Sequence, residues 1–232
     1  MNKKYSYIGI VFIILLFGIY VVRNLSNRID EDQLIKEDRL NNTEKLKKES
    51  GLYKFNKVPE FSFTNQDNLT ISNDTYQGKV YVVEFFFTTC PTICPIMTSK
   101  MLSIQNEFLN QSDFGIASIS ITPEIDTPQI LKEYAKNNGI FHENWHLLTG
   151  KSDEIVYQLS NQGFKLYAGK GEQEHGGFEH SGLFALVDKN GYIRSRKDSY
   201  GNPIMYYRAI KEQTFPDQIK ELKEDIKLLL NE

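Results

Sequence analysis

Two thiols lie close together in the segment FTTCPTICPIM, residues 87–97. Cys90 and Cys94 are the only cysteines in a chain of 232 residues. Two cysteines are too few for a disulfide-dense scaffold. Because they lie within five residues of each other, a disulfide between them could not link distant parts of the fold. Residues four apart lie on one side of a helical turn, or converge at a loop that leads into one. The pair is therefore placed to form a disulfide or to bind a metal ion.

The position of the pair along the chain favours chemistry over simple packing. Each cysteine precedes a proline, and the segment follows an apolar run that predicts a central strand. The end of such a strand is a usual ligand position in α/β folds. A thiolate at a helix amino terminus is favoured by unpaired backbone N–H groups, which lower its pKa. Three intervening residues, one more than in thioredoxin-type motifs, open the sulfur pair enough for a metal ion.

Two thiolates rarely complete a metal site, and the four histidines are the candidates for a third ligand. His142 and His146 flank Trp145 before a short strand, which favours structural or exposed roles. His175 lies in the glycine-rich stretch GKGEQEHGGFEH, which is typical of a polar surface loop. His180 immediately precedes an apolar strand, where an imidazole can be held near a neighbouring loop. Spacing alone leaves the ligand role of His180 open.

The elements that must position these residues alternate between short apolar runs and helical segments. We expect a mixed α/β sheet flanked by helices. The pattern predicts hairpins over 61–71 and 183–195, strands over 80–87, 114–121 and 145–148, and helices over 95–109, from 127, over 152–161 and over 216–230. Thr127 is the expected N-cap of its helix, with Pro128 at the first helical position.

The amino terminus predicts a membrane anchor over residues 1–25. Residues 5–22 carry no charge, and at about 1.5 Å per residue they span roughly 27 Å. A cleaved signal peptide is the alternative, but no small-residue cleavage pattern follows the run. Basic residues on both sides nearly balance, and the free amino group favours an amino terminus inside the cytoplasm. The body of the protein is then expected outside it, on the periplasmic side.

Beyond the anchor, the sequence predicts a charged stalk or linker over 26–50 and one domain over 51–232. The stalk is rich in charge and lacks a sustained heptad repeat. The first 23 residues hold three of the 27 basic side chains and no acidic one, which leaves 24 basic against 30 acidic in the rest. An acidic body argues against binding nucleic acid through its phosphates.

Three motifs together resemble the Sco (SenC-type) family of copper chaperones. They are GKVYVVEFFFTTCPTICPIM, SITPEIDTPQILKEYAK and FEHSGLFALVDKNGYI, in that order between residues 59 and 194. The resemblance implies a membrane-anchored thioredoxin-like domain that faces away from the cytoplasm. It also implies one copper ion, bound by Cys90, Cys94 and His180, for assembly of the copper centre of cytochrome c oxidase. The implied partners are the copper-bearing oxidase subunit or another copper chaperone.

The chain departs from the family pattern in two places. The family often has an aspartate where this chain has Thr122, which questions a carboxylate role at that point, although Glu124 and Asp126 lie nearby. Residues 200–214 have no assignment beyond a lineage-specific loop or interaction surface.

The donor set suits copper, and other functions remain as alternatives. Thiolates select Cu(I), and imidazole also suits Cu(II). Zinc is a possible metal, but no general base or substrate pocket accompanies the three ligands. The main alternative is a thiol–disulfide oxidoreductase with Cys90 as nucleophile and Cys94 as resolving thiol, which would not need His180. A peroxidase of the peroxiredoxin type is disfavoured, because Pro95 follows both thiols and the nearest downstream arginine is Arg194.

Overall fold

The fold was analysed in a computed structural model that describes residues 14–22, 51–172, 177–211 and 215–232. The chain divides into two units, Met1–Gly51 and Leu52–Glu232. Residues 14–22 of the first unit form a helix. Across the described ranges, no helix is both long enough and apolar enough to cross a membrane. The remainder of the predicted anchor and the whole predicted stalk lie outside the described residues.

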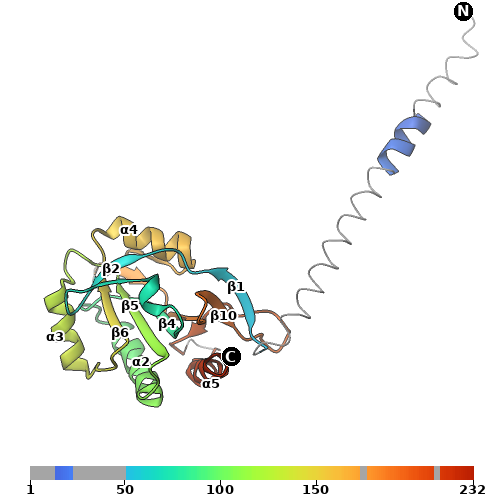
Figure 1. Ribbon diagram of the computed structural model, residues 1–232. Coiled ribbons are helices and arrows are strands. Elements are labelled where there is room, and N and C mark those ends of the chain that lie inside the picture. Colours follow the sequence, from blue (N-terminus) through green and yellow to red (C-terminus); the bar gives the residue numbers. More distant parts are fainter. Residues whose placement is uncertain (1–13, 23–50, 173–176, 212–214) are drawn as a thin grey trace, which may run out of the picture. The chain divides into compact units, whose positions relative to one another are not determined.

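A mixed sheet of nine strands forms the centre of the second unit (Figure 1). Its strand order is β1-β10-β9-β4-β5-β6-β2-β3, and β11 pairs with β9. The bounds are β1 Tyr53–Lys57, β2 Ser62–Asn65, β3 Thr70–Ser72, β4 Val80–Phe86, β5 Phe114–Ser120, β6 Trp145–Thr149, β9 Leu183–Val187, β10 Tyr192–Ser195 and β11 Tyr207–Arg208. A separate two-stranded sheet pairs β7, Ala168–Lys170, with β8, Phe178–His180.

Strand β4 is a central strand of the sheet, because each of its two neighbours, β5 and β9, pairs with a further strand on its other side. It runs parallel to β5 and antiparallel to β9. All seven residues of β4 and all seven of β5 are buried. A strand buried on both faces reads as a continuous apolar run, and that is the pattern that predicted these two strands. The residues that follow the carboxyl end of β4, including Cys90, therefore start from the middle of the sheet.

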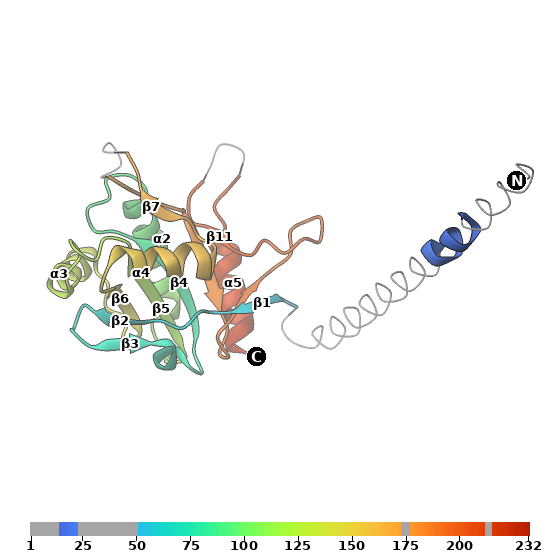
Figure 2. The same ribbon diagram turned by 90° about the horizontal axis from the view of Figure 1, so that it is seen from above.

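Helices cover both faces of the sheet (Figures 1 and 2). Their bounds are the 3-10 helix η2 Asn73–Tyr76, α2 Cys94–Phe108, α3 Pro128–Asn138, α4 Asp153–Tyr157, the π-helix η3 Gln158–Phe164 and α5 Ile219–Leu230. α2 and α5 lie on one face and α4 on the other. The expected cap of α3 is confirmed, since Thr127 Oγ1 accepts a hydrogen bond from the backbone of Ile130.

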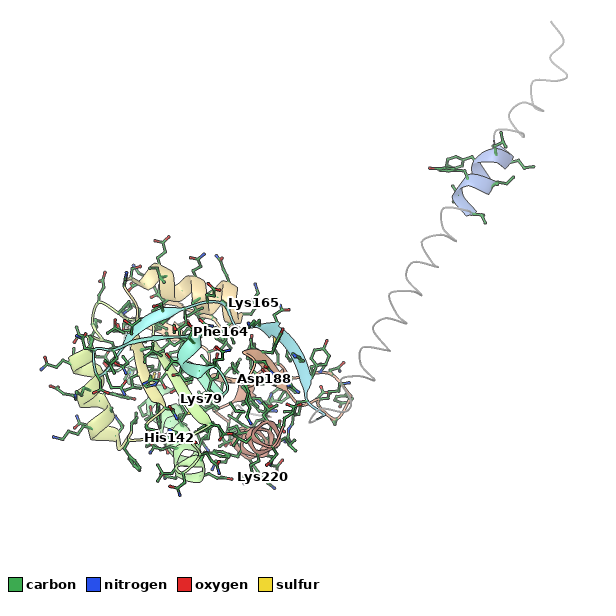
Figure 3. All side chains as sticks on the ribbon, in the orientation of Figure 1. Lys79, His142, Phe164, Lys165, Asp188 and Lys220 are labelled. Carbon is green, nitrogen blue, oxygen red and sulfur yellow. The ribbon has the colours of Figure 1, made fainter. Side chains whose placement is uncertain are left out.

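The predicted α/β class and its main elements are confirmed, and the differences are local. The helix expected over 152–161 is α-helical only to Tyr157 and continues as the π-helix η3 to Phe164 (Figure 3). A side chain at Gly163 would place its Cβ 2.6 Å from Pro59, so this turn requires glycine. The last helix begins at Ile219, three residues later than predicted. Strands β1, β7, β8 and β11 were not predicted.

The segment without an assignment, 200–214, is partly built into the sheet. Strand β11 lies within it, and Tyr207 is fully buried. The Tyr207 hydroxyl donates a hydrogen bond to Asp225 of α5 at 2.6 Å. This part of the segment therefore has a structural role, while residues 212–214 lie outside the described residues.

Candidate metal centre

The two thiols lie where β4 ends and α2 begins. Helix α2 starts at Cys94, and its N-cap, Ile93, makes no side-chain hydrogen bond. The sulfur of Cys90 takes that place, because it accepts a hydrogen bond from the backbone N–H of Cys94 at 3.5 Å. Pro95, in the first turn, lacks an N–H and so removes one orphan donor. The sequence thus folds the first thiol back over the start of the helix that carries the second.

His180 reaches the same point from a different part of the chain. It lies just before the core strand β9, as expected, but it is also the last residue of β8, which was not predicted. Its Nδ1 lies 3.1 Å from the carbonyl oxygen of Ser181. A carbonyl only accepts, so Nδ1 donates this hydrogen bond, and Nε2 is the ring nitrogen that faces the cluster. The ring of Phe87 packs edge-to-face on the imidazole at 5.9 Å.

The ligand atoms of Cys90, Cys94 and His180 converge. All three lie within 4.8 Å of one another. Cys94 Sγ is 2.9 Å from His180 Nε2, across 86 positions of sequence. Two sulfurs and one imidazole nitrogen thus come together, a ligand set that suits a soft cation.

The two thiols differ in acidity. The hydrogen bond from Cys94 lowers the pKa of Cys90 to about 3, against an opposing effect of burial. The same contact raises the pKa of Cys94, and burial raises it further. Cys90 is thus a thiolate and Cys94 a thiol at neutral pH. This asymmetry suits a metal site that exchanges one proton for a cation, and it equally suits a nucleophile with a resolving thiol.

A pocket of about 330 Å³ opens onto the cluster. Its lining includes Cys90 and His180 together with apolar side chains from Phe87, Ile93 and Phe178. Cys94 is 1% exposed, and Cys90 and His180 are each 7% exposed. The cluster is therefore shielded from bulk water and approached from one side, past Cys90 and His180.

The other histidines are occupied elsewhere. His142, labelled in Figure 3, donates from Nε2 to the carbonyl of Phe108 at 3.2 Å and accepts from the backbone of Asn144 at Nδ1. His146 Nδ1 accepts from the side-chain amide of Asn65 at 3.3 Å. Both contacts are structural, as expected. His175 lies outside the described residues.

Sequence reasoning missed one charged group near the cluster. Glu84 is buried in β4, and Ser118 donates a hydrogen bond to its Oε1 at 2.6 Å, while its Oε2 has no hydrogen-bond partner among the described residues. Burial raises the pKa of Glu84 to about 7, partly offset by the Ser118 bond and by His180. Side chains alternate along a strand, so Glu84 shares a face with Phe86, whose ring packs on Tyr134 of α3. The one sign of this group in the sequence is a glutamate inside the apolar run VYVVEFFF.

The fold and the cluster define a class of protein: a thioredoxin-like α/β domain with a buried dithiol–imidazole site. A profile of the SCO1/SenC family matches residues 50–214. The chain belongs to the SCO1/SenC family.

Individual relatives agree with this assignment. The SCO1 protein homolog of Bacillus subtilis is 33% identical over 167 residues, which cover 72% of this chain and 81% of that protein. A SCO1/SenC family lipoprotein from Bacillus anthracis is 30% identical with a TM-score of 0.64, covering 76% of this chain and 96% of that structure.

Two further solved structures share the fold. BsSco, described as a member of the Sco family of cytochrome c oxidase assembly proteins with a disulfide switch, is 28% identical with a TM-score of 0.62, covering 75% and 93% of the two chains. Arabidopsis thaliana ScoI, solved with copper bound, is 24% identical with a TM-score of 0.56, covering 76% and 100%. At this identity, the last comparison shows the fold alone.

Proposed function

We propose that the protein is a membrane-anchored copper chaperone that binds copper through Cys90, Cys94 and His180. In this proposal it delivers copper to the copper centre of cytochrome c oxidase. The observation that carries the proposal is the convergence of the three ligand atoms within 4.8 Å. Support comes from the membership of the SCO1/SenC family and from a relative described as a member of the Sco family of cytochrome c oxidase assembly proteins.

The donor set fits both oxidation states of copper. Two thiolates suit Cu(I), and the imidazole nitrogen is acceptable to Cu(I) and Cu(II). Binding displaces the proton held by Cys94, since a metal ligand must be deprotonated. Among the described residues three donors converge, and the pocket reaches Cys90 and His180 from one side. A client that offers its own ligands through this pocket can take over the ion by ligand exchange.

The test is a Cu(I) competition titration of the full chain, purified in detergent, against a chelator of known affinity. We expect about one copper per chain, and a lower affinity for His180→Ala. His146→Ala is the matched control, because it removes an imidazole outside the cluster. An affinity that His180→Ala left unchanged would remove His180 from the ligand set.

Anchoring is tested separately in cells. Residues 1–25 are proposed to hold the protein in the membrane, with the body on the periplasmic side. The full chain should stay with membranes through alkaline carbonate washing, and a chain that lacks residues 1–25 should be released. Protease added to spheroplasts should digest the body. Protection of the body in intact spheroplasts would reverse the proposed orientation.

A second function, thiol–disulfide exchange, is favoured by the acidity difference between the thiols. A low pKa at Cys90 and a raised pKa at Cys94 are the properties of an attacking and a resolving thiol. The two functions separate at His180: His180→Ala should retain exchange with a small disulfide while it loses copper affinity. Loss of both activities together would mean that the imidazole also serves the thiols.

A further inference from the structure

A fully buried carboxylate ties the thiol segment to the end of β5. Asp126 lies in the loop between β5 and α3 and is 0% exposed. Its Oδ2 accepts from the backbone N–H of Thr88 at 3.1 Å, from Ser120 Oγ at 2.5 Å and from Thr122 Oγ1 at 3.1 Å. Its Oδ1 accepts from the hydroxyl of Thr88. The carboxylate thus joins Thr88 to the end of β5.

The donors explain how a carboxylate can be buried at this place. A buried charge is tolerated only where hydrogen bonds replace water, and bonds to a charged acceptor are stronger than neutral ones. Asp126 has four such bonds, three from hydroxyls and one from a backbone N–H. Because both carboxylate oxygens are bound and the donors approach from Thr88 and from the end of β5, the carboxylate is held in one position.

Two of the four bonds fix the residue two positions before the first thiol. Thr88 is bound through both its backbone and its side chain. From there the chain turns, with the N–H of Cys90 donating to the carbonyl of Phe87 at 3.3 Å. At its far end the segment is attached where Cys94 N–H donates to Cys90 Sγ. The first thiol therefore lies between two anchors, of which Asp126 is the one outside the segment.

We propose that Asp126 is a positioning residue for the metal site, which holds Cys90 in reach of Cys94 and His180. The inference rests on the proposed copper function and adds to it a residue that does not touch the ion. Groups that orient metal ligands from outside commonly contribute 10–100-fold to affinity. The inference also gives Thr122 a role, because its hydroxyl donates to the carboxylate four residues further along.

The sharpest variants are Thr88→Val and Thr88→Ser in the full chain. Thr88→Val keeps the shape and the backbone bond but removes the hydroxyl donor, while Thr88→Ser keeps the hydroxyl. Asp126→Asn is the stronger variant, since it replaces an acceptor oxygen by an amide. Asp225→Asn is its control: Asp225 is equally buried in α5 and accepts from Arg196 and Tyr207.

Two measurements are made well below the melting temperature of each variant. The first is Cu(I) affinity, which should fall about tenfold in Asp126→Asn, fall less in Thr88→Val and stay unchanged in Thr88→Ser. The second needs no metal: dibromobimane becomes fluorescent when it bridges two thiols, and so it reports whether Cys90 is held near Cys94. We expect the bridged signal to fall in Asp126→Asn and Thr88→Val only.

The outcomes separate positioning from stability and from the copper function itself. If Asp126→Asn lowered the melting temperature but matched Asp225→Asn in bridging and in affinity, Asp126 would be structural only and the inference would be overturned. If Asp126→Asn did not fold, a loss in Thr88→Val restored in Thr88→Ser would support positioning, and no loss would overturn it. If even the wild-type chain bound no Cu(I), the proposed function would fail while bridging still decided the positioning role.

Discussion

Cys94 Sγ and His180 Nε2 lie 2.9 Å apart at the meeting point of α2 and β8. Because Nδ1 of the imidazole donates to the Ser181 carbonyl, Nε2 is the nitrogen that faces the thiol. The Cys94 thiol donates its proton to the Cys90 sulfur and lies beside the imidazole. A site that holds one proton among three potential metal ligands can exchange it for a soft cation.

The acidity difference predicts which thiol reacts in the metal-free protein. Because the pKa of Cys90 is lowered to about 3, its alkylation by iodoacetamide should change little between pH 5 and pH 8. Cys94, with a raised pKa and 1% exposure, should stay unmodified. Mass spectrometry of the peptides that carry each cysteine measures both rates.

The control for this experiment is Cys94→Ala. That variant loses the hydrogen bond that lowers the pKa of Cys90, so the alkylation of Cys90 should become strongly pH-dependent. A wild-type rate that rose about tenfold per pH unit, as for an ordinary thiol below its pKa, would contradict the asymmetry.

The proposed ligands predict a spectroscopic signature for Cu(II). With thiolate ligands, the loaded protein should show a sulfur-to-copper charge-transfer band in the visible or near-ultraviolet. Cys90→Ser should abolish or strongly weaken it, because a serine oxygen is a harder ligand than a thiolate. Ser103→Ala, in the middle of α2, is a neutral control. Full Cu(II) loading without any such band would favour the oxidoreductase over the copper chaperone.

The sequence predicted the parts of this fold that rest on local pattern. β4 and β5 read as apolar runs because both of their faces are buried, and the thiols were placed at the end of β4 for that reason. β7, with the sequence AGK, has no strand pattern and forms only by pairing with β8. Since that pairing places His180, the residues alone left its role open, and only the family resemblance singled it out.

Tertiary contacts decided what local pattern did not show. Asp126 stood out only as a neighbour of Thr122, because its four donors belong to three residues and two of the four come from Thr88, 38 positions away. Glu84 was read as part of an apolar run, since its partner Ser118 lies 34 positions away on β5. Buried polar pairs of this kind depend on strand register, which no spacing in one strand reveals.

The buried strand β11, within segment 200–214, predicts that a substitution at Tyr207 lowers stability without changing function. In Tyr207→Phe, Asp225 loses the phenol donor but keeps both bonds from Arg196. We expect about 1 kcal/mol of lost stability in urea unfolding, with an unchanged m-value and unchanged Cu(I) affinity. Tyr200→Phe is the control, because Tyr200 is 89% exposed and its variant should match the wild type. Weaker copper binding in Tyr207→Phe would link this segment to the site.

The raised pKa of Glu84 predicts that the metal-free chain loses stability as pH rises. The unfolded chain releases this proton near pH 4.5, whereas the folded chain keeps it until about pH 7. Between these values the folded state binds more protons, so the free energy of unfolding falls with pH across that window. In Glu84→Gln this loss disappears. The variant should gain up to about 3 kcal/mol on the wild type between pH 4.5 and pH 8, for a pKa difference of about 2.5.

Urea unfolding at a series of pH values, with copper excluded by a chelator, measures this gain. Glu60→Gln is the matched control, because Glu60 is exposed and the same substitution there should leave the pH dependence of the wild type intact. Since Ser118 can still donate to the remaining carbonyl oxygen, Glu84→Gln keeps that hydrogen bond, and the difference between the two variants isolates the buried charge. Parallel stability curves for wild type and Glu84→Gln from pH 4.5 to pH 8 would show that Glu84 is not protonated in the folded chain.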